Sequence, residues 1–237
     1  MRARRPKRQN AGIENARALD LFAGTHSFSR VAQQLGWECV SLDISNKHSP
    51  TICCDVLTWD FKQYPKGHFD FIWCSPPCQM LSVAPAHLFT AEQREERAQA
   101  TIEVVKKMFE ILEWFQPRFY CIENPHSSAL WRLPIMQGFS TVVVSYCMYG
   151  FKYRKNTRLA TNVSFDAKKC HNNCGNLRVF IVNGKPVRKH LEVAKQGVDQ
   201  TCKRNGLNVQ TNTHTQDELY RVPEKLIEDI LTSAGQT

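Results

Sequence analysis

The chain has 237 residues, of which 42% are hydrophobic and 22% charged, an ordinary composition for a globular protein with one sizeable core. No apolar run approaches the roughly 18 residues of a membrane helix, and no apolar segment follows the basic N-terminus, so the sequence predicts neither a membrane span nor a secretory signal. We therefore expect an intracellular protein whose ten cysteines are reduced.

The formal net charge of +9 is unevenly distributed along the chain. Residues 1–10 contain five Arg or Lys and no acid, and residues 152–204 contain thirteen against three acids. Clustered Lys and Arg release counterions from a polyanion on binding, so the pattern favours a nucleic-acid partner. The alternatives are a solvated basic surface and, for the first ten residues, a nuclear address.

Hydrophobic periodicity and turn residues predict short apolar strands that alternate with helices. The expected strands are 17–22, 38–42, 51–54, 69–73, 119–122, 141–146, 159–163 and 178–182, and the expected helices are 28–35, 90–115 and 223–231. The longest helix has the clearest boundaries, because Thr90 and Gln93 form a capping box and Pro117 ends it. This alternation predicts an α/β fold with a doubly wound, mainly parallel sheet.

The same patterns divide the chain into four segments. We expect a flexible basic tail at 1–16, a catalytic domain at 17–163, a small basic insert at 164–220 and a helix at 221–237 that packs on the catalytic domain. The insert interrupts the alternation, because it is basic and rich in Asn and has one short apolar strand. Pro223 suits the first turn of the last helix.

Two aspartates follow neighbouring strands close to a tight turn. The turn after the first strand contains Gly24, and its backbone N–H groups can approach a bound cofactor closely. Asp43 ends the next strand and is placed to accept hydrogen bonds from ribose hydroxyls, and Asp55 after the third strand could reach an adenine amino group. Either aspartate is equally well explained as a turn or cap residue.

Cys78 lies in the sequence PCQMLS at 77–82, just after the apolar strand 69–73. Enzymes of the α/β class keep their chemistry at the carboxyl ends of strands, where Glu123 also lies after another predicted strand. A nucleophilic thiol is therefore predicted at Cys78. The alternative is a buried structural thiol.

Four motifs together carry a specific family resemblance. They are DLFAG at 20–24, PCQMLS at 77–82, EN at 123–124 and the segment from Arg154 to Arg158. Their order resembles that of the DNA cytosine-5 methyltransferase family over residues 18–163. The dipeptide TR at 157–158, followed by TN at 161–162, is similar to the compact viral and phage branch. The resemblance implies a Rossmann-like fold that binds S-adenosylmethionine.

The resemblance also implies covalent chemistry on a cytosine that is flipped out of double-stranded DNA. Cys78 adds to carbon 6 of the ring, which makes carbon 5 nucleophilic enough to take the methyl group. Glu123 holds N3 and the exocyclic amine, while Arg158, with Arg154, braces the carbonyl oxygen and a nearby phosphate. The residues implied for the cofactor are Asp20, Phe22, Gly24, Ser27, Asp43, Ile44, Asp55, Val56 and Pro76.

Three alternatives to this function stay open. His26 stands where the family usually has a second glycine, which leaves a catalytically inactive DNA-binding relative as one alternative. Ser75, Pro76 and Pro77 resemble the signature of amino-group methyltransferases, which form no covalent adduct. Because a basic surface does not distinguish DNA from RNA, an RNA cytosine methyltransferase is the third.

The basic insert contains candidate zinc ligands. Cys170, Cys174, His190 and Cys202 could bind zinc tetrahedrally and hold together a segment too polar for its own core, with His171 as an alternative to His190. Loose thiols are the other interpretation. The resemblance implies that the insert is a reduced target-recognition element, which predicts a short or relaxed recognition sequence and an affinity dominated by phosphate contacts. We expect no membrane partner, and the sequence leaves the oligomeric state open.

Overall fold

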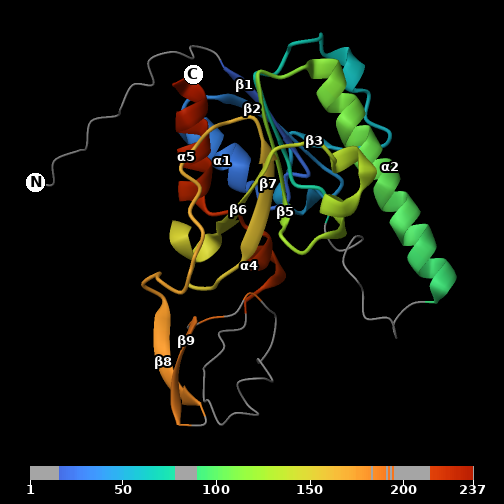
Figure 1. The fold of residues 1–237 in the computed structure, drawn as a ribbon. Helices are drawn as coiled ribbons and strands as arrows, with labels where there is room; N and C mark the ends of the chain where they lie inside the picture. The colour runs from blue at the N-terminus through green and yellow to red at the C-terminus, as the bar shows by residue number, and fades with distance from the viewer. Residues whose placement is uncertain are drawn as a thin grey trace, which may run out of the picture.

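The computed structural model describes residues 16–77, 90–182, 184–190, 192, 194 and 214–236 (Figure 1). Its centre is a seven-stranded sheet with the strand order β3-β2-β1-β4-β5-β7-β6. The strands are β1 (Arg17–Leu21), β2 (Glu38–Asp43), β3 (Ile52–Cys53), β4 (Phe71–Cys74), β5 (Phe119–Pro125), β6 (Thr141–Ser145) and β7 (Asn156–Thr161). Strand β7 runs antiparallel to both of its neighbours, and the other neighbouring pairs are parallel. The predicted doubly wound, mainly parallel sheet is confirmed.

The order in which strands are added to the sheet reverses at β1. The chain passes from β1 outward to β2 and β3, and then returns to place β4 on the other side of β1. At such a switch point the loops after the two central strands diverge, and their carboxyl ends border the crevice in which α/β proteins bind ligands. The fold therefore locates the candidate site beyond β1 and β4.

Helices cover both faces of the sheet (Figure 1). Helices α1 (Ser27–Gln34) and α5 (Glu224–Gly235) share one apolar cluster with the sheet, in which Phe28 stacks on Trp73 with ring centroids 5.1 Å apart. Helix α2 (Ala91–Phe115) belongs to the cluster on the other face, and its Thr90–Gln93 capping box is present as predicted. The shorter helical segments are Asn46–His48, Phe61–Gln63, Ala129–Arg132, Pro134–Met136, Tyr146–Tyr149 and α4 (Gln216–Tyr220).

The last helix joins the N-terminal part of the fold. Helix α5 buries the four predicted apolar residues, Leu226, Ile227, Ile230 and Leu231. Just before it, the N–H of Val222 donates to Ser27 Oγ at 3.1 Å, and Arg30 pairs with Glu224 at 2.8 Å. These contacts fix the start of α1 from a segment almost two hundred residues away.

Three features differ from the sequence prediction. Strand β5 continues past residue 122 to Pro125 because β7 pairs with it, so Glu123 lies inside a strand. The insert contains a hairpin, β8 (Leu177–Val182) with β9 (Lys185–His190), of which only the first strand was expected. Helix α4 was not predicted either, although Thr215 and Glu218 form a capping box.

Figure 1 shows the hairpin extending away from the sheet and its helices. The sequence signal for it is the Asn–Gly dipeptide at 183–184, which favours two-residue hairpin turns, and Gly184 has the positive φ of 74° that such turns require. The expected tail at 1–16 lies, except for its last residue, outside the described part. Within the described part, no helix is long and apolar enough to cross a membrane.

A buried carboxyl group joins β1 to α1. Asp20 is 2% exposed and accepts hydrogen bonds from the backbone N–H and the hydroxyl of Ser29. Burial raises its pKa to about 7, although the two bonds from Ser29 act in the opposite direction, and the nearby charge of Asp43 adds to the increase. The folded protein therefore favours the neutral form of Asp20 up to about neutral pH.

The raised pKa predicts a specific pH dependence of stability. A carboxyl whose folded pKa lies above its unfolded pKa of about 3.9 stabilises the fold most at low pH, and this contribution is lost as pH rises through the folded value. Between about pH 4 and pH 8 the free energy of unfolding should fall more steeply for the natural protein than for Asp20→Asn. Urea unfolding across that range measures the difference, with exposed Asp60→Asn as control. Parallel curves for the natural protein and Asp20→Asn would refute it.

Candidate active site

The predicted site residues converge on the carboxyl edge of the sheet. Asp20 lies near the end of β1, Asp43 ends β2, Pro76 follows β4 and Glu123 lies near the end of β5. These strands are neighbours in the sheet, on both sides of the switch point. The fold therefore brings residues from four separate stretches of sequence to one edge of the sheet.

The turn after β1 is held open by an unusual run of backbone conformations. Phe22, Gly24 and His26 all have positive φ values, of 64°, 48° and 58°. Asp43 stabilises the turn, because its Oδ2 accepts from the N–H of Gly24 at 2.8 Å while its Oδ1 accepts from Ser45 at 2.8 Å. Each carboxylate oxygen can accept a further bond, so Asp43 serves the turn and retains capacity for a ligand hydroxyl.

Apolar side chains stand exposed next to these acids. Ile44 directly follows β2 and is 70% exposed, and Leu57, two residues after Asp55, is 40% exposed. An exposed aliphatic residue beside acceptor oxygens suits a ligand with a flat apolar ring and polar edges. Asp55 itself caps the turn after β3 through the N–H of Leu57 at 2.9 Å.

Three other expected cofactor residues have clear roles in the fold. Val56 is buried in the apolar cluster beneath α2. The hydroxyl of Ser27 is occupied by Val222 and lies 3.2 Å from the hydroxyl of Thr25, and Asp20 binds Ser29. These three residues are therefore buried parts of the fold, whereas Asp43 is partly exposed and Ile44 is exposed at the edge of the sheet.

Glu123 is a buried carboxyl group with one identified donor. It is 6% exposed, and the hydroxyl of Tyr146 donates to its Oε1 at 2.9 Å. Tyr146 is fully buried, and burial followed by the charge of Glu123 raises its pKa well above the usual value, so Tyr146 stays a neutral donor. Sequence reasoning missed Tyr146, because it begins a helical turn after β6 that only the folded sheet brings against β5.

Asn124, the next residue, restrains the segment that leads to Cys78. Its side-chain amide donates to the carbonyl oxygen of Pro76 at 2.7 Å in a buried position. Ser75 is held as well, because its N–H donates to Leu21 and its hydroxyl accepts from the indole of Trp73 at 2.8 Å. Cys78, the predicted nucleophile, lies outside the described residues.

The register between β5 and β7 separates Arg158 from Glu123. Glu123 is paired with Leu159 and Asn124 with Arg158, and directly paired residues project from the same face of a sheet. Arg158 therefore lies on the Asn124 face, where its guanidinium is 5.5 Å from the Trp131 ring centroid and 3.4 Å from Nδ1 of His126. The structure brings both residues to the same edge but on opposite faces.

The positively charged side chains of Lys155 and Arg154 lie apart from Arg158. Lys155 is on the Glu123 side, with its ammonium 5.0 Å from the Tyr146 ring centroid and donating to the carbonyl oxygen of Leu219 at 2.9 Å. Arg154 instead donates to Asn172 Oδ1 at 3.2 Å, in the loop that precedes the hairpin. The sequence pattern had not indicated Lys155.

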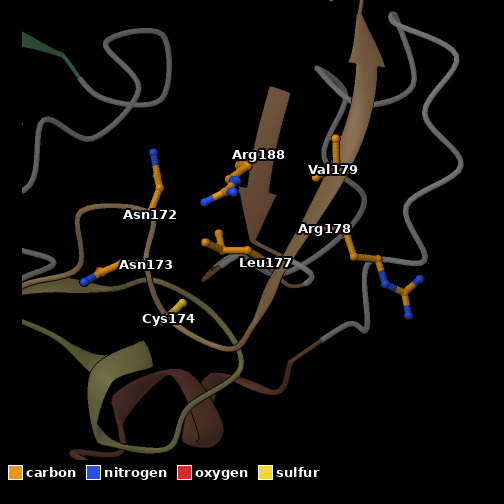
Figure 2. A pocket seen from close by; sticks show the side chains of 7 residues that line it. All are labelled: Asn172, Asn173, Cys174, Leu177, Arg178, Val179 and Arg188. Carbon is orange, nitrogen blue, oxygen red and sulfur yellow. The ribbon is translucent and has the colours of Figure 1, made fainter. Parts of the chain in front are cut away.

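A second cluster of polar side chains lies at the foot of the hairpin. Cys147, Cys170, Cys174 and His190 place their ligand atoms within 4.8 Å of one another, which forms a group that could hold zinc. Three of these were predicted, but Cys147 was not, and Cys202 lies outside the described residues. Figure 2 shows Cys174 next to Asn172, Asn173 and Leu177, beside a small pocket at this end of the hairpin.

Comparisons with known proteins identify sequence relatives of this chain. Residues 16–128 match the family model described as C-5 cytosine-specific DNA methylase. A protein of Frog virus 3 (isolate Goorha), named "Probable DNA (cytosine-5)-methyltransferase", is 32% identical over 164 residues, which cover 65% of this chain and 74% of the viral one.

One solved structure shows the same fold class at low sequence identity. The methyltransferase EhMeth of Entamoeba histolytica superposes with a TM-score of 0.52 at 11% identity, covering 94% of this chain and 99% of that one. The Dnmt2 methyltransferase of S. pombe has a TM-score of 0.43 at 13% identity, covering 65% of this chain and 52% of that one. This chain thus spans about half the length of the S. pombe protein.

The tether from Asn124 predicts a measurable contribution to stability. Asn124→Ala leaves the buried carbonyl of Pro76 without its donor, which should lower the free energy of unfolding by about 1–3 kcal/mol. Urea unfolding measures this loss, and exposed Asn46→Ala is the matched control, expected to change little. An Asn124→Ala protein as stable as the control would show that the tether is not a significant restraint.

Proposed function

The chain belongs to the C-5 cytosine-specific DNA methylase family, and from this premise we propose which of its residues methylate cytosine in double-stranded DNA and how. In this family the methyl group comes from S-adenosylmethionine. The observation that carries the proposal is the buried carboxyl group of Glu123, held by Tyr146 beside the residue that tethers Pro76. A buried, oriented carboxyl group next to the tether of the Cys78 segment suits a base that must be gripped during thiolate attack.

The crevice edge fits the cofactor that the family uses. Its turn exposes backbone around Gly24, Asp43 keeps acceptor capacity, and Ile44 and Leu57 offer exposed apolar surface. We assign Asp43 to the ribose hydroxyls and Ile44 with Leu57 to the adenine ring, with Asp55 near its amino group. When bound, the cofactor supplies an electrophilic methyl group, and residues of the chain bind the base and activate its carbon 5.

Cys78 is the nucleophile in this proposal, and Glu123 binds the base. The thiolate of Cys78 forms a bond to carbon 6, which moves electron density to carbon 5 and toward N3. Glu123 holds N3 and the exocyclic amine, and a proton shared there neutralises the developing charge. After the methyl group is transferred, loss of the carbon 5 proton and elimination of the thiol free the enzyme. Tyr146 is a positioning residue, because it keeps one oxygen of Glu123 occupied and orients the other.

The positions of the arginines change part of the expected assignment. Arg158 lies on the face opposite Glu123, so we retain its phosphate contact and no longer assign it the base carbonyl. Arg154, bonded to Asn172, supports the loop before the hairpin. A direct contact of Arg154 with the base is therefore replaced by a role near the recognition segment.

We propose that the β8–β9 hairpin is the main DNA-reading element of the 164–220 segment. Arg178, Lys185 and Arg188 are exposed on it, and Val179 and Ile181 are 60% and 64% exposed. A two-stranded ribbon fits the major groove, where basic residues meet phosphates and guanine, and apolar residues meet thymine methyl groups. A hairpin of this size reads few base pairs, in keeping with a short recognition sequence. A DNA substrate also fits the expected intracellular location, in a host nucleus or cytoplasm.

The covalent mechanism predicts a trapped adduct. With tritiated S-adenosylmethionine and duplex DNA containing 5-fluorocytosine, the protein should form a denaturation-resistant labelled adduct, because fluorine prevents the final elimination. Cys78→Ala should form none, and Cys53→Ala, at an exposed cysteine, should behave as the natural protein. Glu123→Gln should slow methyl transfer about 10²–10⁴-fold. Tyr146→Phe should slow it less.

The other outcomes of the same experiment identify the alternatives. Labelled product without an adduct would favour amino-group methylation at the Ser75–Pro77 segment. An adduct formed with RNA but not with duplex DNA would identify an RNA methyltransferase. Absence of cofactor binding and of any product would indicate an inactive DNA-binding relative.

The hairpin assignment predicts a change in the salt dependence of DNA binding. Replacing both Arg178 and Arg188 by Gln should make the plot of log affinity against log salt shallower by about 0.9 for each phosphate that the variant no longer neutralises. Lys106→Gln on α2 is the matched control, since it removes an exposed charge far from the hairpin along the chain. Fluorescence anisotropy at several salt concentrations measures the DNA affinity of each variant and of the natural protein. Equal slopes for the double variant and the natural protein would exclude the hairpin from the phosphate contacts.

A further inference from the structure

The hairpin at the edge of the molecule lacks an apolar anchor. Neither apolar cluster of the described residues includes a residue of β8 or β9. Val179 and Ile181 face solvent, and a two-stranded hairpin alone in water is marginally stable. An interaction other than apolar packing must therefore fix it to the sheet.

The four clustered side chains lie where such an interaction is needed. Cys147 comes from the helical turn after β6, Cys170 and Cys174 from the loop before the hairpin, and His190 from the end of β9. They bring together three stretches of chain that are well separated in the sequence. Figure 2 shows Cys174 on the loop close to Leu177, the first residue of the hairpin.

The distances between the four ligand atoms are those of a tetrahedral metal site. His190 Nε2 is 3.5 Å from Cys170 Sγ and 3.2 Å from Cys174 Sγ, and all four atoms lie within 4.8 Å. Zinc bonds of about 2.3 Å to sulfur and about 2.0 Å to nitrogen separate the ligand atoms of a tetrahedron by about 3.5 Å for sulfur to nitrogen and about 3.8 Å for sulfur to sulfur. Three thiolates and one imidazole form a donor set that selects zinc over oxygen-loving cations.

The surroundings of the cluster hold its loop in place and bring a positive charge to that loop. The N–H of Cys170 donates to Ser145 Oγ at 3.0 Å, which attaches the loop to the end of β6. The amide of Asn172 draws the guanidinium of Arg154 to the same loop. A zinc ion with three thiolates carries a net negative charge, which the positive charge of Arg154 would partly neutralise. The loop thus holds both the cluster residues and this arginine.

We propose that Cys147, Cys170, Cys174 and His190 bind one zinc ion that clamps the β8–β9 hairpin to the sheet. Cys202 is not a ligand in this arrangement. Because Cys147 directly follows Tyr146, the clamp and the donor to Glu123 share one helical turn. The metal site does not depend on the proposed function, whereas the value of a fixed hairpin for DNA reading rests on it.

Zinc analysis of the purified full-length chain tests the proposal. Under reducing conditions the natural protein should contain about one zinc per chain. Cys147→Ser and Cys174→Ser should lose it, whereas Cys202→Ser and the exposed Cys53→Ser should retain it. A natural protein that neither contains nor takes up zinc would overturn the proposal, and so would zinc that persists in Cys147→Ser but is lost in Cys202→Ser.

Two measurements on the natural chain cover variants that fail to fold. Cobalt added after removal of zinc should give the intense visible absorption of a tetrahedral thiolate site, and Cys202→Ser should give the same spectrum. Zinc removal should also accelerate tryptic cleavage at Arg178 and Arg188 but not in α2. Unchanged cleavage, or a spectrum without thiolate bands, would overturn the clamp. None of these readouts uses methyl transfer, so they can fail independently of the proposed function.

Discussion

The antiparallel pairing of β7 with β5 is the constraint on which the site depends. It extends β5 through Glu123 and Asn124, and its register decides which of these two residues Arg158 shares a face with. A shift of β7 by one residue would pair Arg158 with Glu123 or Pro125 and move its side chain to the Glu123 face. Glu123 and Asn124 therefore contact different partners, Tyr146 on the proposed base-binding side and Pro76 in the segment that leads to Cys78.

Three buried polar side chains at this edge of the sheet each have an identified hydrogen-bond partner. Asp20 is matched by Ser29, Glu123 by Tyr146 and Asn124 by the carbonyl of Pro76. An unpaired buried polar group costs about 1–3 kcal/mol, so each pair makes one local arrangement strongly preferred over its alternatives. The buried side chains of Asp20, Glu123 and Asn124 are thus held by hydrogen bonds, while Asp43 is partly exposed and Ile44 is exposed to solvent.

The sequence predicted the parallel part of the fold because its signals are local. Continuous apolar runs marked the buried strands, and the Thr90 capping box and Pro117 marked the ends of α2. The end of β5 was not predictable in this way, because its last residues are polar and become a strand only when β7 pairs with them. Strand β9, with its basic residues, was missed although the Asn–Gly turn at 183–184 pointed to it.

In the candidate site too, local sequence signals predicted some features, and contacts between distant segments determined the others. Motif order located Glu123 and the aspartates at strand ends, but motif spacing carries no information on sheet faces, so it grouped Arg158 with Glu123. Cys147 enters the cluster of Cys170, Cys174 and His190 from the helical turn after β6, which is a contact between distant segments. Spacing within the insert could not reveal it.

The packing of α5 on α1 also has a consequence for biosynthesis. Phe28, Val31 and Ala32 form the inner face of α1, and they share their apolar cluster with Leu226, Ile227 and Ile230. During translation the early strands and α1 emerge first, but this part of their cover is made only after residue 230 leaves the ribosome. The start of α1 at Ser27 therefore lacks its Val222 contact throughout most of synthesis. A nascent chain of this design exposes apolar surface for longer than one whose helices pack in order of appearance, which makes it a natural client for chaperones.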